Sequence, residues 1–177
     1  IGGDLLTEDE IRLLGGFRPG AIQLEIGVQT TNPEVMKRIG RVNKKEALFA
    51  NVRMLLQHGK QHVHLDLIAG LPGEDMQSFI RSFDEVYNLH PHQLQLGFLK
   101  VLGNTRISRE TEEYGIKYRD YPPYEVLETD SISYRELLEL KQVEDMVEIY
   151  YNSGQFAEEL RFLENFLRRN TWKNSDG

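Results

Sequence analysis

The sequence predicts an α/β fold with parallel strands, followed by a helical C-terminal region. Three segments, beginning near residues 21, 62 and 92, alternate apolar and polar residues as half-buried strands do, and helical patterns separate them. Strands joined by helices pair in parallel through right-handed crossovers. The 177 residues are 40% hydrophobic, which suffices for one domain with a core, or for one domain and a small addition.

The pattern of polar caps and glycines sets the expected bounds of each element. Strands are expected over 21–28, 62–69 and 92–101, and helices over 4–14, 33–39, 43–57 and 75–89. Thr7 begins the first helix as its N-cap, since a glutamate three residues later completes a capping box. Asn32 precedes a proline suited to the first helical position. Asn43 caps the next helix, and Gly59 ends it.

The character of the chain changes after about residue 103. A helix is expected over 106–115, an extended segment over 116–130, and charged amphipathic helices over 133–151 and 155–169. The sequence therefore predicts two parts, an α/β part over 1–105 and a mostly helical extension over 106–177.

Each expected strand has one apolar and one polar face, because strand side chains alternate. The polar face carries Gln23, Glu25, Gly27, Gln29, His62, His64, Asp66, Gln93, Gln95 and Gly97. Parallel sheets covered on both faces read as continuous apolar runs, so a barrel with a ligand-filled interior explains this face well. A sheet with one solvated face is the alternative. In barrel enzymes the chemistry lies at the carboxyl ends of the strands, where Gln29, Asp66 and Lys100 are expected.

Composition excludes several classes of function. The net charge of −7 argues against broad binding to nucleic acid or to anionic membranes. No apolar run of ~18 residues exists to span a membrane, and no secretory signal opens the chain, so a cytoplasmic location is expected. The absence of cysteine excludes disulfides, zinc–thiolate sites, cysteine nucleophiles and iron–sulfur ligation by this chain.

The segment from Asp66 to Glu74 is the most specific motif. Gly70 and Gly73 permit backbone conformations closed to other residues and let a ligand approach the main chain. Pro72 stiffens the turn between them. A plain strand-to-helix turn explains the same spacing.

A second constellation pairs a strand-end amide with an arginine. The amide of Gln29 can both donate to and accept from ligand hydroxyls, and Arg41 can clamp a carboxylate with two parallel bonds. Most arginines are solvated surface residues, and that is the alternative for Arg41.

These motifs, in this order and spacing, resemble the second half of a radical S-adenosylmethionine (radical SAM) core. The similarity is to oxygen-independent coproporphyrinogen III oxidase-like proteins and to the cobalamin-binding radical SAM proteins described as magnesium-protoporphyrin monomethyl ester cyclases or Fe–S oxidoreductases. It covers about residues 1–103. The resemblance implies the C-terminal half of a six-stranded partial (β/α) barrel, and an oxidoreductase parent that cleaves S-adenosylmethionine to a 5′-deoxyadenosyl radical.

The resemblance also implies roles for individual residues. Gln29 and Asp66 would contact the ribose hydroxyls of S-adenosylmethionine, and Arg41 would pair with its carboxylate. The backbone from Ile68 through Gly70 and Pro72 to Gly73 would lie beside the adenine, with the segment around Lys100 giving apolar cover.

The chain departs from the family because no cysteine is present to hold the [4Fe–4S] cluster. We expect a fragment whose partner is a missing N-terminal half, with a cobalamin domain further upstream as an option. Alone, it is expected to be inactive, to bind S-adenosylmethionine weakly, and to self-associate through unpaired strand edges.

Three other functions stay open. A metal-dependent hydrolase barrel would use His62, His64 and Asp66, which lie on one strand face. A non-catalytic interaction module would use the charged helices over 133–169. A tRNA-modifying radical SAM enzyme would need a basic surface, which the net charge disfavours.

Overall fold

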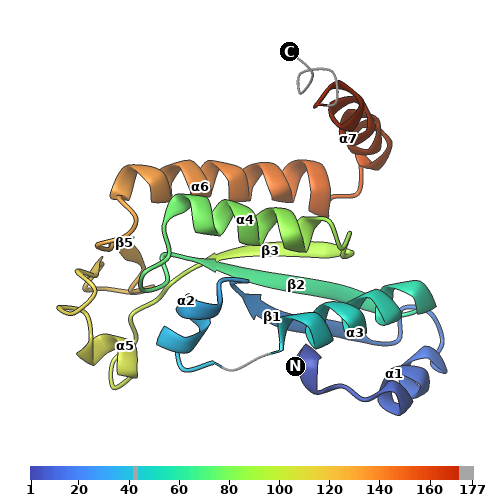
Figure 1. Ribbon diagram of the computed structural model, residues 1–177, viewed down its shortest axis with the longest axis horizontal. Helices are drawn as coiled ribbons and strands as arrows, with labels where there is room; N and C mark the ends of the chain where they lie inside the picture. Colours follow the sequence, from blue (N-terminus) through green and yellow to red (C-terminus); the bar gives the residue numbers. More distant parts are fainter. Residues whose placement is uncertain (42–43, 172–177) are drawn as a thin grey trace.

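The computed structural model describes residues 1–41 and 44–171 (Figure 1). The elements in chain order are η1 (Gly3–Leu5), α1 (Glu8–Gly15), β1 (Gln23–Gln29), α2 (Pro33–Arg38), α3 (Lys45–His58), β2 (His62–Ala69), α4 (Met76–Tyr87), β3 (Gln93–Phe98), α5 (Arg106–Arg109), β4 (Lys117–Tyr118), β5 (Val126–Glu128), α6 (Tyr134–Met146), η2 (Val147–Asn152) and α7 (Ala157–Thr171).

The three expected strands form one parallel sheet in the order β1-β2-β3, as predicted. Glu25 lies opposite His64, and His64 lies opposite Gln93, so one polar row crosses the sheet. The next row joins Gly27, Asp66 and Gln95. These rows lie on the same face, and the carboxyl ends of all three strands lie at the same edge of the sheet.

Side-chain caps fix where the helices begin and end. Thr7 and Glu10 form the expected capping box on α1. The Asn32 side chain accepts hydrogen bonds from the amides of Glu34 and Val35, which confirms it as the cap of α2. Gly59 ends α3 in the left-handed region at φ +63°, as expected. The predicted cap Asn43 lies outside the described residues.

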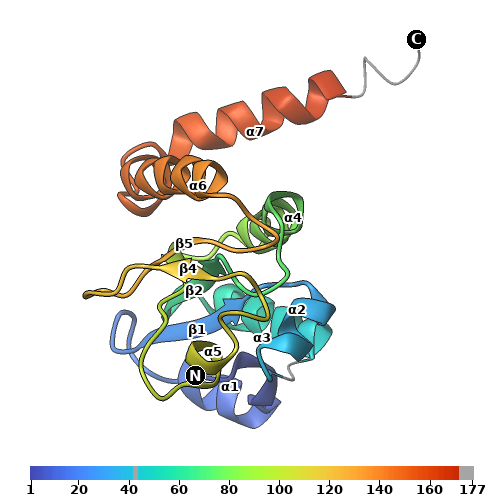
Figure 2. The ribbon, with the colours of Figure 1, turned by 90° about the vertical axis from the view of Figure 1, so that its left-hand side faces the viewer.

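The two faces of the sheet differ as the alternation predicted. Ile26, Val63, Leu65 and Leu94 are fully buried on one face. Helices α3 and α4 lie along that side of the strands (Figure 2). Polar residues of the other face are half-buried or exposed, with His64 as the buried exception.

The region after β3 differs from the prediction in three places. The third strand ends at Phe98 rather than at 101, and α5 has only four residues, because 110–115 form turns. The extended stretch contains a short antiparallel pair, β4 and β5. Helix α6 passes directly into a π-helical segment, η2, whose Asn152 side chain hydrogen-bonds both the N–H and the C=O of Leu94 on β3.

The hydrophobic core is continuous across the two parts. Val126, Ile132 and Leu137 are buried in the same cluster as the sheet residues. Helix α7 projects away from the rest of the molecule (Figure 2). Among the described residues, none of the helices combines the length and the apolar character that crossing a bilayer requires.

Candidate functional site

A pocket of about 450 Å³ lies on the polar face, near the carboxyl end of β1. Its wall is formed by Glu25, Gly27, Gln29, Arg41 and Asp66, together with residues 1–4. Three of the eight residues predicted to bind a ligand therefore meet in one place, although they come from β1, from the segment after α2 and from β2. Gln29, Arg41 and Asp66 are thus distant in the sequence and are brought together by the fold.

Gln29 sits at a distorted end of β1. The Thr30 amide donates to the carbonyl of Val28 at 3.0 Å, which closes a three-residue γ-turn around Gln29, and the φ of Gln29 is +71°. The register also shifts between Gly27 and Gln29. A non-glycine residue held at positive φ stores strain of about 1–3 kcal/mol, so the surrounding structure must hold it there.

Arg41 is placed by the end of α2. The amide of Gly40 bonds to the carbonyl of Lys37, and the amide of Arg41 bonds to that of Met36, with Gly40 at φ +69°. These two bonds form a Schellman motif, which ends the helix and turns the chain. The Nη1 atom of Arg41 then donates to the carbonyl of Gly27 at 3.3 Å, across from the end of β1.

Gly27 has no room for a side chain. A Cβ there would lie 2.5 Å from Nε2 of Gln29 and 3.4 Å from Nη1 of Arg41. The glycine thus lets the amide of Gln29 and the guanidinium of Arg41 lie close together over the strand. Both groups can donate hydrogen bonds to a ligand in the pocket.

Asp66 has an oxygen that the protein does not satisfy. Its Oδ1 atom is buried and meets no hydrogen-bond partner among the described residues. Burial, followed by the nearby Glu25 carboxylate, raises the pKa of Asp66, while His64 acts in the opposite direction. A buried polar atom without a partner is costly, so this oxygen is suited to a hydroxyl donor from a ligand.

The other five predicted residues do not line this pocket. Ile68 is half-buried on the same face beside Gly97. Pro72 is buried, and Lys100 is exposed and pairs with Glu125 through an isolated β-bridge.

The two predicted glycines, Gly70 and Gly73, also make room for other parts of this chain. Both have positive φ, +80° at Gly70 and +76° at Gly73. A Cβ at Gly70 would lie 2.6 Å from Cγ1 of Val126, and one at Gly73 would overlap the guanidinium of Arg38. The glycines therefore make room for α2 and for the extension.

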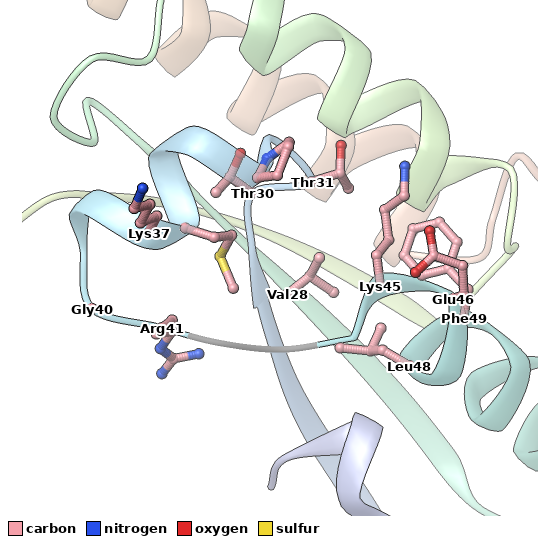
Figure 3. A pocket seen from close by; sticks show the side chains of 12 residues that line it. Val28, Thr30, Thr31, Lys37, Gly40, Arg41, Lys45, Glu46, Leu48 and Phe49 are labelled. Atoms are coloured by element: carbon pink, nitrogen blue, oxygen red, sulfur yellow. The ribbon is translucent and has the colours of Figure 1, made fainter.

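A second pocket, of about 490 Å³, lies on the other side of β1 (Figure 3). Its lining is largely apolar and includes Val28, Leu48 and Phe49. Arg41 belongs to the walls of both pockets, and its guanidinium points away from Thr30 and Thr31 in Figure 3. We assign the candidate site to the polar pocket because the predicted polar groups converge there.

Sequence reasoning missed the role of Glu74. Acidic residues near the start of a helix suit the positive end of its dipole, and Glu74 and Asp75 directly precede α4. Asp75 is the N-cap, but Glu74 is only 1% exposed. Its Oε1 atom lies 2.5 Å from the Thr30 hydroxyl and 3.2 Å from the Ser78 hydroxyl. Burial raises the pKa of Glu74 from its ordinary 4.5 to about 7, against the opposing effect of these hydrogen bonds. The available signal was the Thr-Thr-Asn sequence directly after the first strand.

Three histidines, two on β2 and one just before β3, lie close together. The ring of His62 is 4.7 Å from that of His64 and 5.1 Å from that of His92, measured between centroids. Burial and the neighbouring His62 lower the pKa of His64. Within 1–41 and 44–171, no group of three or more His, Cys, Asp or Glu side chains is arranged to hold a metal ion. The hydrolase alternative therefore gains no support from this geometry.

Comparison with known families bears on the first half of the chain. Residues 1–86 match the model of the radical SAM superfamily. This part of the chain is similar to radical SAM proteins. Residues 112–172 match a second model, described as a protein of unknown function (DUF4080).

Among curated relatives, the oxygen-independent coproporphyrinogen-III oxidase-like protein HemZ of Bacillus subtilis is 28% identical over 117 residues. That match covers 66% of this chain and 23% of the relative. The resemblance expected from the sequence is confirmed. The chain spans about a quarter of the length of this relative.

Two solved structures share the fold. Coproporphyrinogen III oxidase (HemN) from Escherichia coli, a radical SAM enzyme, has a TM-score of 0.57 and 21% identity, over 81% of this chain and 30% of that one. The radical S-adenosylmethionine methyltransferase TsrM from Kitasatospora setae, with cobalamin and a [4Fe–4S] cluster bound, has a TM-score of 0.56 and 17% identity, over 70% and 26%. The expected α/β fold class is confirmed, since the parallel three-stranded sheet and its helices share the fold of part of these structures.

The residues present suit one of the family's two cofactors. The unsatisfied oxygen of Asp66 and the adjacent amide and guanidinium suit the hydroxyls and carboxylate of S-adenosylmethionine. The chain has no cysteine, so it offers no thiolate for an iron–sulfur cluster.

Substitution of Gly27 by Ala should displace the Gln29 amide without unfolding the strand. The conflicting atom is the end of a flexible side chain, and an alanine in a strand loses less conformational entropy than glycine, by about 0.5–1 kcal/mol. We expect a large shift of the Gln29 side-chain amide resonances with a change in unfolding free energy below about 1 kcal/mol. Gly97→Ala is the matched control on the same face, since its Cβ would meet only ordinary contacts at 3.5 and 3.9 Å. An unmoved Gln29 amide in Gly27→Ala would contradict the described packing.

Substitution of Glu74 by Gln should change how stability depends on pH. Between pH 4.5 and about 7 the unfolded chain releases the Glu74 proton while the folded chain keeps it, so wild-type stability falls as the pH rises through this window. The loss amounts to about 3 kcal/mol when complete, and Glu74→Gln cannot undergo it. Urea unfolding at pH 5 and pH 8 measures the difference. If the unfolding free energies of Glu74→Gln and the wild type changed equally between pH 5 and pH 8, the carboxyl would not be buried as described.

Proposed function

We propose that this chain supplies part of the S-adenosylmethionine-binding wall of a radical SAM oxidoreductase. The observation that carries the proposal is the convergence of Gln29, Arg41 and Asp66 on one polar pocket at the carboxyl end of a parallel sheet. In this proposal the amide and the carboxylate hold the ribose hydroxyls, and the guanidinium holds the carboxylate of the methionine part. S-Adenosylmethionine supplies a 5′-deoxyadenosyl radical when a reduced [4Fe–4S] cluster cleaves it.

The cluster in this proposal is held outside these 177 residues, since they contain no cysteine. The coverage of about a quarter of the HemZ relative supports a protein with more barrel strands than the three seen here. The names of relatives such as HemZ and coproporphyrinogen III oxidase favour a tetrapyrrole substrate for the whole enzyme. On this proposal the isolated chain does not catalyse the reaction.

Each residue has a separate physical task. Asp66 accepts hydrogen bonds from hydroxyl groups through its Oδ1 atom, which otherwise lacks a partner. The amide of Gln29 can accept and donate at the same time, which suits a pair of ribose hydroxyls. Arg41 keeps one N–H on the Gly27 carbonyl, and this bond orients the guanidinium toward a carboxylate.

The isolated chain should bind S-adenosylmethionine weakly and without a metal. We expect a dissociation constant in the millimolar range, corresponding to about −4 kcal/mol, because only part of the wall is present. Arg41→Ala and Asp66→Asn should each weaken binding about tenfold, the loss of one charge-assisted hydrogen bond. Equilibrium dialysis with labelled ligand measures this.

Arg18→Ala serves as the matched control, since Arg18 is exposed before the amino end of β1, away from the pocket. Treatment with iron and sulfide under anaerobic conditions should leave the chain without bound iron. Submicromolar affinity, a stoichiometric cluster, or equal weakening by all three variants would contradict the proposal.

A further inference from the structure

The segment from Gln29 to Arg41 is clamped at its first turn by the start of α4. The Thr30 hydroxyl contacts the Glu74 carboxyl and lies 3.2 Å from the Ser82 hydroxyl. The Thr31 amide donates to Ser82 at 3.0 Å. Side-chain groups of Glu74 and Ser82 thus hold the two residues that directly follow Gln29.

The same clamp reaches the cap of α2. The Asn32 side-chain amide donates to the Ser78 hydroxyl at 2.8 Å, and Ser78 in turn donates to Glu74 at 3.2 Å. The carbonyl of that same Asn32 side chain caps α2, and α2 ends in the turn that places Arg41. The positions of Gln29 and Arg41 therefore depend on one set of contacts around Glu74.

The clamp is built around a carboxyl group that is better suited to the neutral form. Oε2 of Glu74 is buried and meets no hydrogen-bond partner among the described residues. A buried carboxylate with one bare oxygen is far more costly than a neutral acid in the same place. Thr30 and Ser78 both donate to Oε1 of Glu74, and the Thr30 hydroxyl also lies 3.2 Å from that of Ser82. Ionisation of Glu74 would place a charge without solvent among these buried hydroxyls.

We propose that Glu74, through Thr30, is a positioning residue that holds Gln29 and Arg41 in place for S-adenosylmethionine, and that it does so in its neutral form. The proposal rests on the proposed function for the identity of the ligand, but the coupling itself is a property of this chain. Glu74 touches no ligand in this account. Loss of its proton places an unsolvated charge against Thr30, and the change is transmitted to the strained turn at Gln29, the residue before it.

Other charged groups surround this region and must be separated from Glu74. Asp75, the N-cap of α4, lies beside Glu74 and favours its neutral form, and Asp75 also acts on Glu136 of α6. Arg38 of α2 lies over Gly73. In the pocket itself, the Glu25 carboxylate helps to raise the pKa of Asp66.

The test follows the amides of the pocket by NMR in the ¹⁵N-labelled chain between pH 5.5 and 9, without ligand. In the wild type, the Thr30 backbone amide and the Gln29 side-chain amide should titrate with a midpoint near that of Glu74, about 7. In Glu74→Gln this titration should disappear, and only shifts that do not come from Glu74, such as those from Asp66, should remain. Glu85→Gln, the same change on the same helix at a residue paired with Lys45, should titrate like the wild type.

Thr30→Val gives a second and independent test. It keeps the shape of the side chain but removes the hydroxyl, so the Glu74 carboxyl, followed by ¹³C, should still titrate while Gln29 no longer responds. If Glu74→Gln fails to fold, Thr30→Val and the wild-type titration still test whether Glu74 acts on Gln29 through Thr30. A Gln29 response that survives Thr30→Val, or a wild-type Gln29 that does not titrate, would overturn the proposal.

Ligand binding separates this proposal from the function on which it rests. If binding requires neutral Glu74, S-adenosylmethionine affinity at pH 8 should be about tenfold weaker than at pH 6 in the wild type, relative to Glu74→Gln. The ratio to the variant removes the effect of the ligand's own α-amino group, which titrates near pH 8. Coupled NMR titrations without any ligand binding would leave the positioning role intact and contradict the proposed function. If the wild type and Glu74→Gln both bound S-adenosylmethionine with the same pH dependence, the proposed function would stand and the positioning role of neutral Glu74 would be contradicted.

Discussion

The contact between the Thr30 hydroxyl and the Glu74 carboxyl joins the end of β1 to the start of α4, across 44 residues of sequence. The pocket depends on this contact because its two side-chain donors, Gln29 and Arg41, lie on either side of Thr30 along the chain. Gln29 precedes the contact in a strained γ-turn, and Arg41 follows it at the end of α2. Buried polar networks of this kind define one arrangement only when their members are satisfied, and here Oε2 of Glu74 is the exception.

The sheet supplies the second half of the site. Its apolar face packs under α3 and α4, so the alternating residues of each strand must face the other way. This places Asp66 and Gly27 side by side in neighbouring strands, within reach of the donors from the clamped segment. The polar face therefore follows from burial of the other face. Only a few positions along it, such as Asp66 and Gly27, form the pocket.

Much of this arrangement could be predicted because its causes are local. Alternation predicted the three strands, and the Asn32-Pro33 pair predicted the start of α2. Since parallel strands end at one edge, the meeting of Gln29 and Asp66 also followed from the sequence. The reason for Gly70 and Gly73 could not be predicted, because the groups that approach them, Val126 and Arg38, come from distant segments. The same holds for Glu74. The rule that acids favour helix starts describes Asp75, and only the fold shows that its neighbour turns inward to Thr30.

The measurement that tests the account most directly is a map of backbone and side-chain amide shifts as S-adenosylmethionine is added to the labelled chain at pH 6. The chain offers two pockets of similar volume on opposite sides of β1, so the map must choose between them. We predict saturable shifts at Gly27, Asp66 and the Gln29 side chain, with little change at Lys37 and Lys45. Saturable shifts centred on Lys37 and Lys45 would place the ligand in the apolar pocket and contradict the assignment of the polar face as the binding wall.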